Sequence, residues 1–156
     1  MLEIAIPGRE KYLFEHLVLD LNGTIALDGE IVAGVKERLL ILGSNLSVIV
    51  VTADTYGSAQ KHMESLPVKI HIIERGKEDA QKQALVQELG GVKTVSIGNG
   101  SNDVSMLRDS SLGICVMGRE GAAVEAVKNS DVVVPDINSA LDLLIKSDRL
   151  VATLRR

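Results

Sequence analysis

The sequence contains little of what secreted and membrane-spanning proteins need. Its one cysteine, Cys115, has no partner for an intramolecular disulfide, which favours a reducing compartment, and we expect a cytoplasmic protein. No apolar run approaches the ~18 residues of a membrane-spanning helix. The opening residues MLEIAIPGREKY lack the basic region that begins a signal peptide. We therefore expect no membrane partner.

Charge and aromatic content argue against a nucleic-acid partner. The formal net charge is −4, whereas proteins that cover phosphate backbones are usually basic. Aromatic residues make up only 2% of the chain and tryptophan is absent, so bases would find few stacking platforms. The three histidines, His16, His62 and His71, follow no zinc-ligand spacing. We expect neither a nucleic-acid partner nor a zinc site.

Short apolar runs alternate with amphipathic segments along the whole chain. The expected strands are Leu17–Leu19, Val48–Val51, Lys69–Ile73, Val92–Ile97, Gly113–Val116 and Val132–Val134. The expected helices are Val32–Leu42, Tyr56–Ser65, Glu78–Leu89, Asp103–Asp109, Glu120–Lys128 and Asn138–Ile145. Uniformly apolar strands separated by helices indicate a parallel sheet covered on both faces. We expect one α/β domain over residues 1–156, with a three-layer α/β/α Rossmann-like sheet and an added edge strand at Leu2–Ile6.

In such sheets, ligands bind beyond the carboxyl ends of the strands, so the residues that end each strand are candidate site residues. Asp20 ends the first strand and precedes an Asn-Gly turn, although an acid at this place also fits simple turn chemistry. Thr52 ends the second strand. Its hydroxyl can donate to a phosphate oxygen, or it can cap the helix that follows.

Two further signals lie later in the chain. Lys82 is on the helix after the third strand, where a lone lysine is usually solvated. The run GNGSND at residues 98–103 carries the fourth strand into a helix. Its glycines permit close approach of an anion, but Asp103 at the start of a helix also fits an N-cap. Taken singly, these signals leave a structural and a functional interpretation open.

In this order, the four signals together resemble the haloacid dehalogenase superfamily, and within it the phosphorylation domain of P-type ATPases. Residues 20–24 (DLNGT) resemble D-K-T-G-T, and residues 52–54 (TAD) resemble T-G-D. Residues 82–89 (KQALVQEL) resemble K-x-x-x-V-x-x-L, and residues 98–107 are similar to G-D-G-x-N-D-x-x-x-L. The likeness covers nearly the whole chain, which looks like the small soluble proteins described as P-type ATPase-like.

The resemblance implies a magnesium-dependent phosphatase or phosphotransferase that acts through an aspartyl-phosphate on Asp20. Its substrate would be a phosphate ester of a small molecule or a protein. The implied catalytic residues are Asp20, Asn22, Thr52 and Lys82. The implied phosphate-binding residues are Gly23, Thr52, Ala53, Lys82 and Asn102. The implied magnesium ligands are Asp20, the backbone carbonyl of Asn22, and Asn99 or Asp103.

Two positions depart from the family pattern. Asn22 stands where related phosphatases carry an acid–base aspartate, and such help is worth ~10²–10⁴ in rate. Asn99 stands where the ATPases carry a metal-binding aspartate, so the metal site loses one negative charge. Both departures support an alternative, a weak or inactive binding or regulatory protein with the same fold. A receiver domain is a further alternative, but only Glu15 adds an acid near the first strand.

The intervals between the motifs leave no room for a cap domain, so we expect an open site with a small flap at residues 25–31. The C-terminal segment 145–156 (IKSDRLVATLRR) is apolar enough to dock. We expect it to lie on the edge of its own sheet, with the interface of a homo-oligomer as the alternative.

Overall fold

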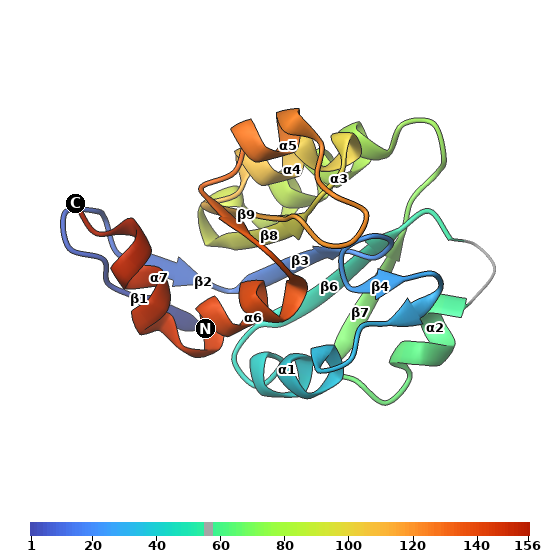
Figure 1. The fold of residues 1–156 in the computed structure, drawn as a ribbon, viewed down its shortest axis with the longest axis horizontal. Coiled ribbons are helices and arrows are strands. Elements are labelled where there is room, and N and C mark those ends of the chain that lie inside the picture. Colours follow the sequence, from blue (N-terminus) through green and yellow to red (C-terminus); the bar gives the residue numbers. More distant parts are fainter. Residues whose placement is uncertain (55–57) are drawn as a thin grey trace.

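The computed structural model describes residues 1–54 and 58–156. Six parallel strands form the central sheet in the order β10-β9-β8-β3-β6-β7, which confirms the expected three-layer α/β/α arrangement (Figure 1). The strands are β3 His16–Asp20, β6 Ser47–Thr52, β7 Val68–Ile72, β8 Thr94–Gly98, β9 Leu112–Val116 and β10 Val132–Val134. The helices are α1 Val35–Leu42, α2 Ser58–Met63, α3 Glu78–Leu89, α4 Val104–Asp109, α5 Val124–Lys128, α6 Ile137–Ile145 and α7 Ser147–Leu154.

Alternation along the central strand explains why both faces of the sheet need helices. Leu17 and Leu19 of β3 belong to the core under α1 and α6, whereas Val18 between them belongs to the core under α3 and α4. Successive side chains of a strand point to opposite faces, so an apolar strand needs cover on both. All three side chains are fully buried. Burial of each contributes ~1.5–3 kcal/mol, and the two cores together hold β3 in the middle of the sheet.

Two expected helices begin later in the structure than the sequence pattern indicated. The helix expected from residue 32 starts at Val35, because Gly34 before it adopts a left-handed conformation with φ of 88°. The helix expected from residue 120 starts at Val124, because residues 117–123 form a loop instead. The helix expected over residues 56–65 begins outside the described residues, and its described part is α2.

The strand expected at Leu2–Ile6 does not add to an edge of the main sheet, so its expected position is wrong. Its first residues form β1 (Leu2–Ile4), which pairs antiparallel with β2 (Tyr12–Phe14) in a separate hairpin, while β10 and β7 form the edges of the main sheet. The chain reverses at Pro7-Gly8, where Gly8 has φ of 80°. The partner strand has only three residues, which is too short for a sequence pattern to reveal it.

The C-terminal segment docks on its own chain, but on this hairpin and not on the sheet edge as expected. Leu150 and Leu154 of α7 are buried in the same core as Ile4 and Phe14. The side chain of Arg9 donates a hydrogen bond to the carbonyl of Leu154 at 3.0 Å. Both ends of the chain therefore lie at the hairpin end of the molecule (Figure 1).

The flap expected at residues 25–31 is a short hairpin of β4 (Ala26–Leu27) and β5 (Glu30–Ile31). Its turn is Asp28-Gly29, with both residues at positive φ, as two-residue hairpin turns require. No separate cap domain is formed by the described residues.

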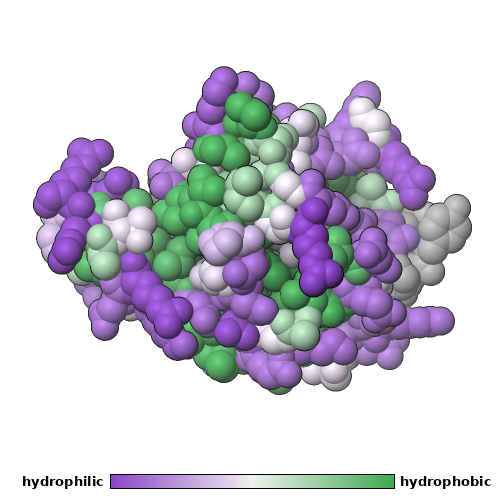
Figure 2. All heavy atoms as spheres, in the orientation of Figure 1, coloured by the Kyte–Doolittle hydropathy of each residue, from purple (hydrophilic) through white to green (hydrophobic). Residues whose placement is uncertain are grey.

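The surface seen in Figure 2 is hydrophobic between α5 and α6, near the edge strand β10, and hydrophilic at its two ends. Three large side chains contribute exposed apolar area in this region: Met117, Val124 and Val133, which are 41%, 67% and 43% exposed. Within residues 1–54 and 58–156, no helix is long and apolar enough to cross a membrane.

Candidate active site

Asp20 is the last residue of β3, the strand that lies between β8 and β6 inside the sheet. Its carboxylate Oδ1 is 2.7 Å from Nζ of Lys82, which reaches it from α3. The same Nζ is 2.7 Å from Oδ1 of Asp103. Lys82 is only 2% exposed, so this is a buried ammonium held between two carboxylates. A helix lysine is usually solvated, and its burial here requires both partners.

The electrostatics of these groups follow from their burial. Burial, and then the charge of Asp103, raise the pKa of the Asp20 carboxyl to about 6, against the lowering effect of Lys82. Burial acts to lower the pKa of the Lys82 ammonium, but the charges of Asp20 and Asp103 outweigh it and raise this pKa. Lys82 is therefore a fixed positive charge at neutral pH, directly beside Asp20.

Asp103 is fully buried and has both carboxylate oxygens engaged. Oδ1 accepts from Lys82, and Oδ2 accepts from the backbone N–H groups of Asn99 and Gly100, each at 2.9 Å. A Cβ on Gly98 would lie 2.5 Å from this carboxylate, so only glycine fits at that strand end. Asp103 therefore holds the turn of residues 98–103 and the ammonium of Lys82 in place. Because its oxygens are engaged in this way, Asn99 is more available to a metal than Asp103.

The side chain of Asn99 is held with its oxygen toward Asp20. Its Nδ2 donates to the carbonyl of Gly121 at 3.0 Å, which turns Oδ1 the other way. The hydroxyl of Thr24 lies 3.1 Å from Oδ2 of Asp20 and 3.3 Å from Oδ1 of Asn99. One hydroxyl hydrogen serves one acceptor at a time, so Thr24 leaves one of these two oxygens without its hydrogen bond.

The oxygen atoms of Asp20 and Asn99 are of the kinds that bind a magnesium ion. Magnesium binds carboxylate, amide and carbonyl oxygens and keeps several waters, and it is commonly held by only one or two protein carboxylates. Asp20 and Asn99 offer one carboxylate and one amide oxygen, and both oxygens lie beside the hydroxyl of Thr24. In the described part of the chain, no three or more His, Cys, Asp or Glu residues gather as a metal cluster. A metal here would therefore complete its coordination with water, the Asn22 carbonyl and substrate.

Thr52 is buried at the end of β6, 3% exposed. Its Oγ1 accepts a hydrogen bond from the backbone N–H of Asp54 at 3.0 Å. The oxygen is thus used by the local turn, while the hydroxyl hydrogen can still donate to an anion.

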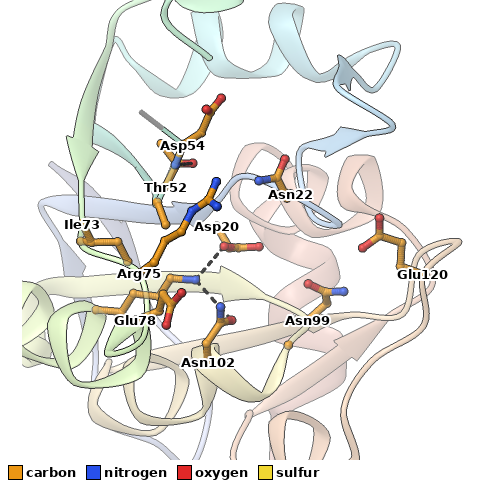
Figure 3. Close-up of a pocket in the computed structure, with 13 residues that line it drawn as sticks. Asp20, Asn22, Thr52, Asp54, Ile73, Arg75, Glu78, Asn99, Asn102 and Glu120 are labelled. Carbon is orange, nitrogen blue, oxygen red and sulfur yellow. Dashed lines mark hydrogen bonds and ion pairs between the residues drawn. The ribbon is translucent and has the colours of Figure 1, made fainter. Parts of the chain in front are cut away.

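A pocket of about 570 Å³ joins these strand ends (Figure 3). It is lined by seven residues that the sequence predicted: Asp20, Asn22, Thr52, Ala53, Lys82, Asn99 and Asn102. Two predicted residues stand apart from its lining. Asp103 lies behind Lys82, and Gly23 faces a second hollow of about 540 Å³ beneath the flap hairpin.

Three charged lining residues, Arg75, Glu78 and Glu120, were missed by the sequence analysis. Arg75 comes from the connection between β7 and α3, Glu78 is the first residue of α3, and Glu120 comes from the loop after β9. In Figure 3, Arg75 extends toward Thr52 and Asp20, while Glu120 lies on the opposite side, beyond Asn99. All three follow the carboxyl ends of strands, so the strand-end rule would have found them had it been applied to every strand.

Sequence comparison finds relatives of two kinds. An uncharacterized protein of Methanocaldococcus jannaschii is 46% identical over 84 residues, which are 51% of this chain and 90% of that protein. Phospholipid-transporting ATPase IG of Homo sapiens is 40% identical over 74 residues, which are 47% of this chain. The match spans only 6% of that ATPase. No family model matches the chain.

Solved structures share the fold. The 3-deoxy-D-manno-octulosonate 8-phosphate phosphatase of Moraxella catarrhalis, in complex with magnesium, phosphate and KDO, has a TM-score of 0.67 at 17% identity. The match covers 91% of this chain and 94% of that one. The cobalt-bound deoxy-D-mannose-octulosonate 8-phosphate phosphatase of Haemophilus influenzae has a TM-score of 0.71 at 12% identity, and the match covers 92% of this chain and 94% of that one.

The chain thus has the α/β fold of these phosphatases, with a strand-end aspartate bonded to a buried lysine. The shared fold supports the resemblance to the haloacid dehalogenase superfamily that the four motifs predicted, and the local sequence matches to phospholipid-transporting ATPases agree with it.

Proposed function

We propose that the protein is a magnesium-dependent phosphatase or phosphotransferase that forms an aspartyl-phosphate on Asp20. The observation that carries the proposal is the Asp20–Lys82–Asp103 chain at the end of the central strand, open to the pocket. A lysine is held buried and charged beside a carboxylate that still lines the pocket. This arrangement suits a nucleophile that meets a dianionic phosphate.

In the proposed reaction, Asp20 attacks phosphorus, the bond to the ester oxygen breaks, and the phosphoryl group becomes bonded to the Asp20 carboxylate. The hydroxyl of Thr52 and the ammonium of Lys82 hold the phosphate oxygens and offset their charge, which supplies much of the catalysis in phosphoryl transfer. Gly23, Ala53 and Asn102 would line the same oxygens. Water, or an acceptor alcohol, then takes the phosphoryl group and frees Asp20.

A bound magnesium ion would supply positive charge on the side of Asp20 that faces Asn99. Asp20, Asn99 and the Asn22 carbonyl would hold it. Asn22 cannot donate or accept a proton as an acid–base group, so the released oxygen takes its proton from solvent. We therefore expect slow turnover and a preference for phosphate esters whose leaving oxygen needs little protonation. The open site admits a small-molecule or a protein substrate, in a protein that we expect in the cytoplasm.

The test is phosphorylation of the whole chain with a reactive donor, acetyl phosphate or an aryl phosphate, in the presence of magnesium. We expect mass spectrometry to detect one phosphoryl group on the wild-type protein and none on Asp20→Asn, with equal circular dichroism spectra. Label on the Asp20→Asn variant, or undiminished turnover by it, would contradict the proposal.

A second candidate function is a binding or regulatory protein that has kept the fold and lost turnover. The observation that favours it is the pair of neutral residues, Asn22 and Asn99, at two positions where the family carries aspartate. Such a protein would bind phosphate and magnesium but would give neither labelled Asp20 nor product from an aryl phosphate.

A further inference from the structure

The metal site described above has only one carboxylate available to it. Asp20 supplies that group, while Asp103 has both oxygens committed to Lys82 and to backbone N–H groups. Magnesium is commonly held by one or two carboxylates, and groups that hydrogen-bond its ligands raise its affinity further. A further carboxylate on the same side of Asp20 as Asn99 would add negative charge to this site.

Glu120 is such a group. It lies on the loop of residues 117–123, and its Oε2 comes so near the backbone of the nucleophile loop that a Cβ on Gly23 would be 2.3 Å away. The same Cβ position is 3.0 Å from Nδ2 of Asn99. Two constraints therefore require glycine at position 23. Its φ of 80° disfavours a side chain, and Glu120 occupies the space that a Cβ would need. Figure 3 shows Glu120 beyond Asn99, away from Arg75 and Glu78.

The loop that carries Glu120 is tied to the site and to neighbouring strands. The side chain of Asn99 donates to the carbonyl of Gly121, and the backbone carbonyl of Asn99 accepts from the N–H of Ala123 at 2.8 Å. At its other end, the N–H of Met117 donates to Val134 at 2.9 Å. Asn99 thus has two tasks, because its amide offers an oxygen toward Asp20 and also fixes the loop that presents Glu120.

This double task gives a physical reason for asparagine at position 99. An aspartate there would place a carboxylate oxygen against the Gly121 carbonyl and lose the bond that holds the loop. Among the described residues, Glu120 has no ion-pair or hydrogen-bond partner, so its carboxylate is available to a ligand. The charge that position 99 lacks is supplied by a neighbouring loop.

We propose that Glu120 is the second carboxylate of the metal site and binds the water ligands of a divalent cation held by Asp20 and Asn99. The proposal rests on the proposed magnesium-dependent function. Glu120 acts one layer outside the metal, because its Oε2 lies on the Nδ2 side of Asn99, whereas Oδ1 faces Asp20. Groups that orient the ligands of a metal in this way typically contribute a factor of 10–100 to its affinity.

The test is calorimetric titration of the whole chain with magnesium chloride, without substrate. The variants are Glu120→Gln, its control Glu125→Gln, and Asp20→Asn. Glu125 is an exposed glutamate of α5 that forms an ion pair with Lys128, so its loss removes the same charge away from the site. Circular dichroism and thermal midpoints in EDTA establish that all variants are folded, as expected for a Gln in place of the exposed Glu120. Manganese binding, followed by electron paramagnetic resonance, gives an independent readout.

We expect Glu120→Gln to weaken magnesium and manganese binding by roughly 10–100-fold, Glu125→Gln to leave both within about two-fold, and Asp20→Asn to abolish them. Binding by Glu120→Gln within two-fold of wild type, while Asp20→Asn still abolishes it, would overturn this inference and leave the proposed function standing. A wild-type protein that binds neither metal would overturn both. Equal weakening by Glu125→Gln would reduce the effect to net charge and would also overturn the inference.

Discussion

Replacing Lys82 with methionine removes the cation between two buried carboxylates and leaves the volume of the side chain nearly unchanged. Lys82 is 2% exposed and lies 2.7 Å from both Asp20 and Asp103. Removing one partner of a buried ion pair typically costs ~3–5 kcal/mol, because the remaining charge stays buried without compensation. For a chain of this size, that loss would lower the thermal midpoint by roughly 6–20 °C.

The effect should depend on pH in a defined direction. The folded pKa of Lys82 is raised, so the lysine is fully charged below its unfolded pKa of about 10.4 and does not itself titrate between pH 5 and 8. In the variant, the pKa of the Asp20 carboxyl rises further in the folded state, because burial and the charge of Asp103 are no longer opposed by Lys82. The folded variant then binds protons more readily than the unfolded chain, and it regains stability as the pH falls from 8 toward 5.

The assay is urea unfolding in EDTA at pH 8 and at pH 5.5, for the wild type, Lys82→Met, Asp20→Asn and the double variant. We expect the difference between wild type and Lys82→Met to be larger at pH 8. We also expect Lys82→Met to cost less in the Asp20→Asn background, with a coupling free energy of about 1 kcal/mol or more. A loss below about 1 kcal/mol at pH 8, equal at both pH values, would refute the argument from burial.

Three further predictions concern single side chains. Asn22→Asp restores an acid–base group, so aryl phosphate hydrolysis at saturating magnesium should rise on the order of 10²-fold; no gain in rate and no loss of trapped phosphoenzyme would favour the regulatory function. Arg75→Ala removes an exposed cation of the pocket, so KM for the phosphate ester should rise roughly five-fold at nearly constant kcat, which corresponds to about 1 kcal/mol for an exposed charge. The control Arg9→Ala, at the distant hairpin, should change neither KM nor kcat. The hydrogen bond and charge of Arg38 hold the pKa of Asp142 below its ordinary value, so its stabilisation is present above the unfolded pKa and is lost as the pH falls through the lowered value. Urea unfolding should show Asp142→Asn to be less stable than wild type by a constant amount from pH 5 to 8, with a smaller difference below about pH 4; a difference that grows on acidification would contradict this.

The sequence by itself determined the order of strands and helices and the positions of the four motifs. The six apolar runs are the strands of the sheet. A parallel strand that is covered on both faces is apolar throughout, as residues 48–51 are, so its sequence identifies it as a strand. The strand-end rule then placed Asp20, Thr52 and Asn99 at one edge, since parallel strands end on the same side. Local chemistry also fixed the Asp28-Gly29 hairpin turn.

Tertiary structure decided which neighbours each side chain meets. In the sequence, Lys82 resembles a surface residue of a helix. In the folded chain, its ammonium lies between Asp20 and Asp103, which are 62 and 21 residues away. The partner of β1 could not be predicted because Tyr12–Phe14 is a strand of only three residues, and it shares its core with α7 from the other end of the chain. Glu120 had no motif of its own. It reaches the pocket because Asn99 holds its loop and Gly23 leaves the space for it. Gly23 and Glu120 are 97 residues apart in the chain, so their contact is set by packing and is not encoded in a local pattern.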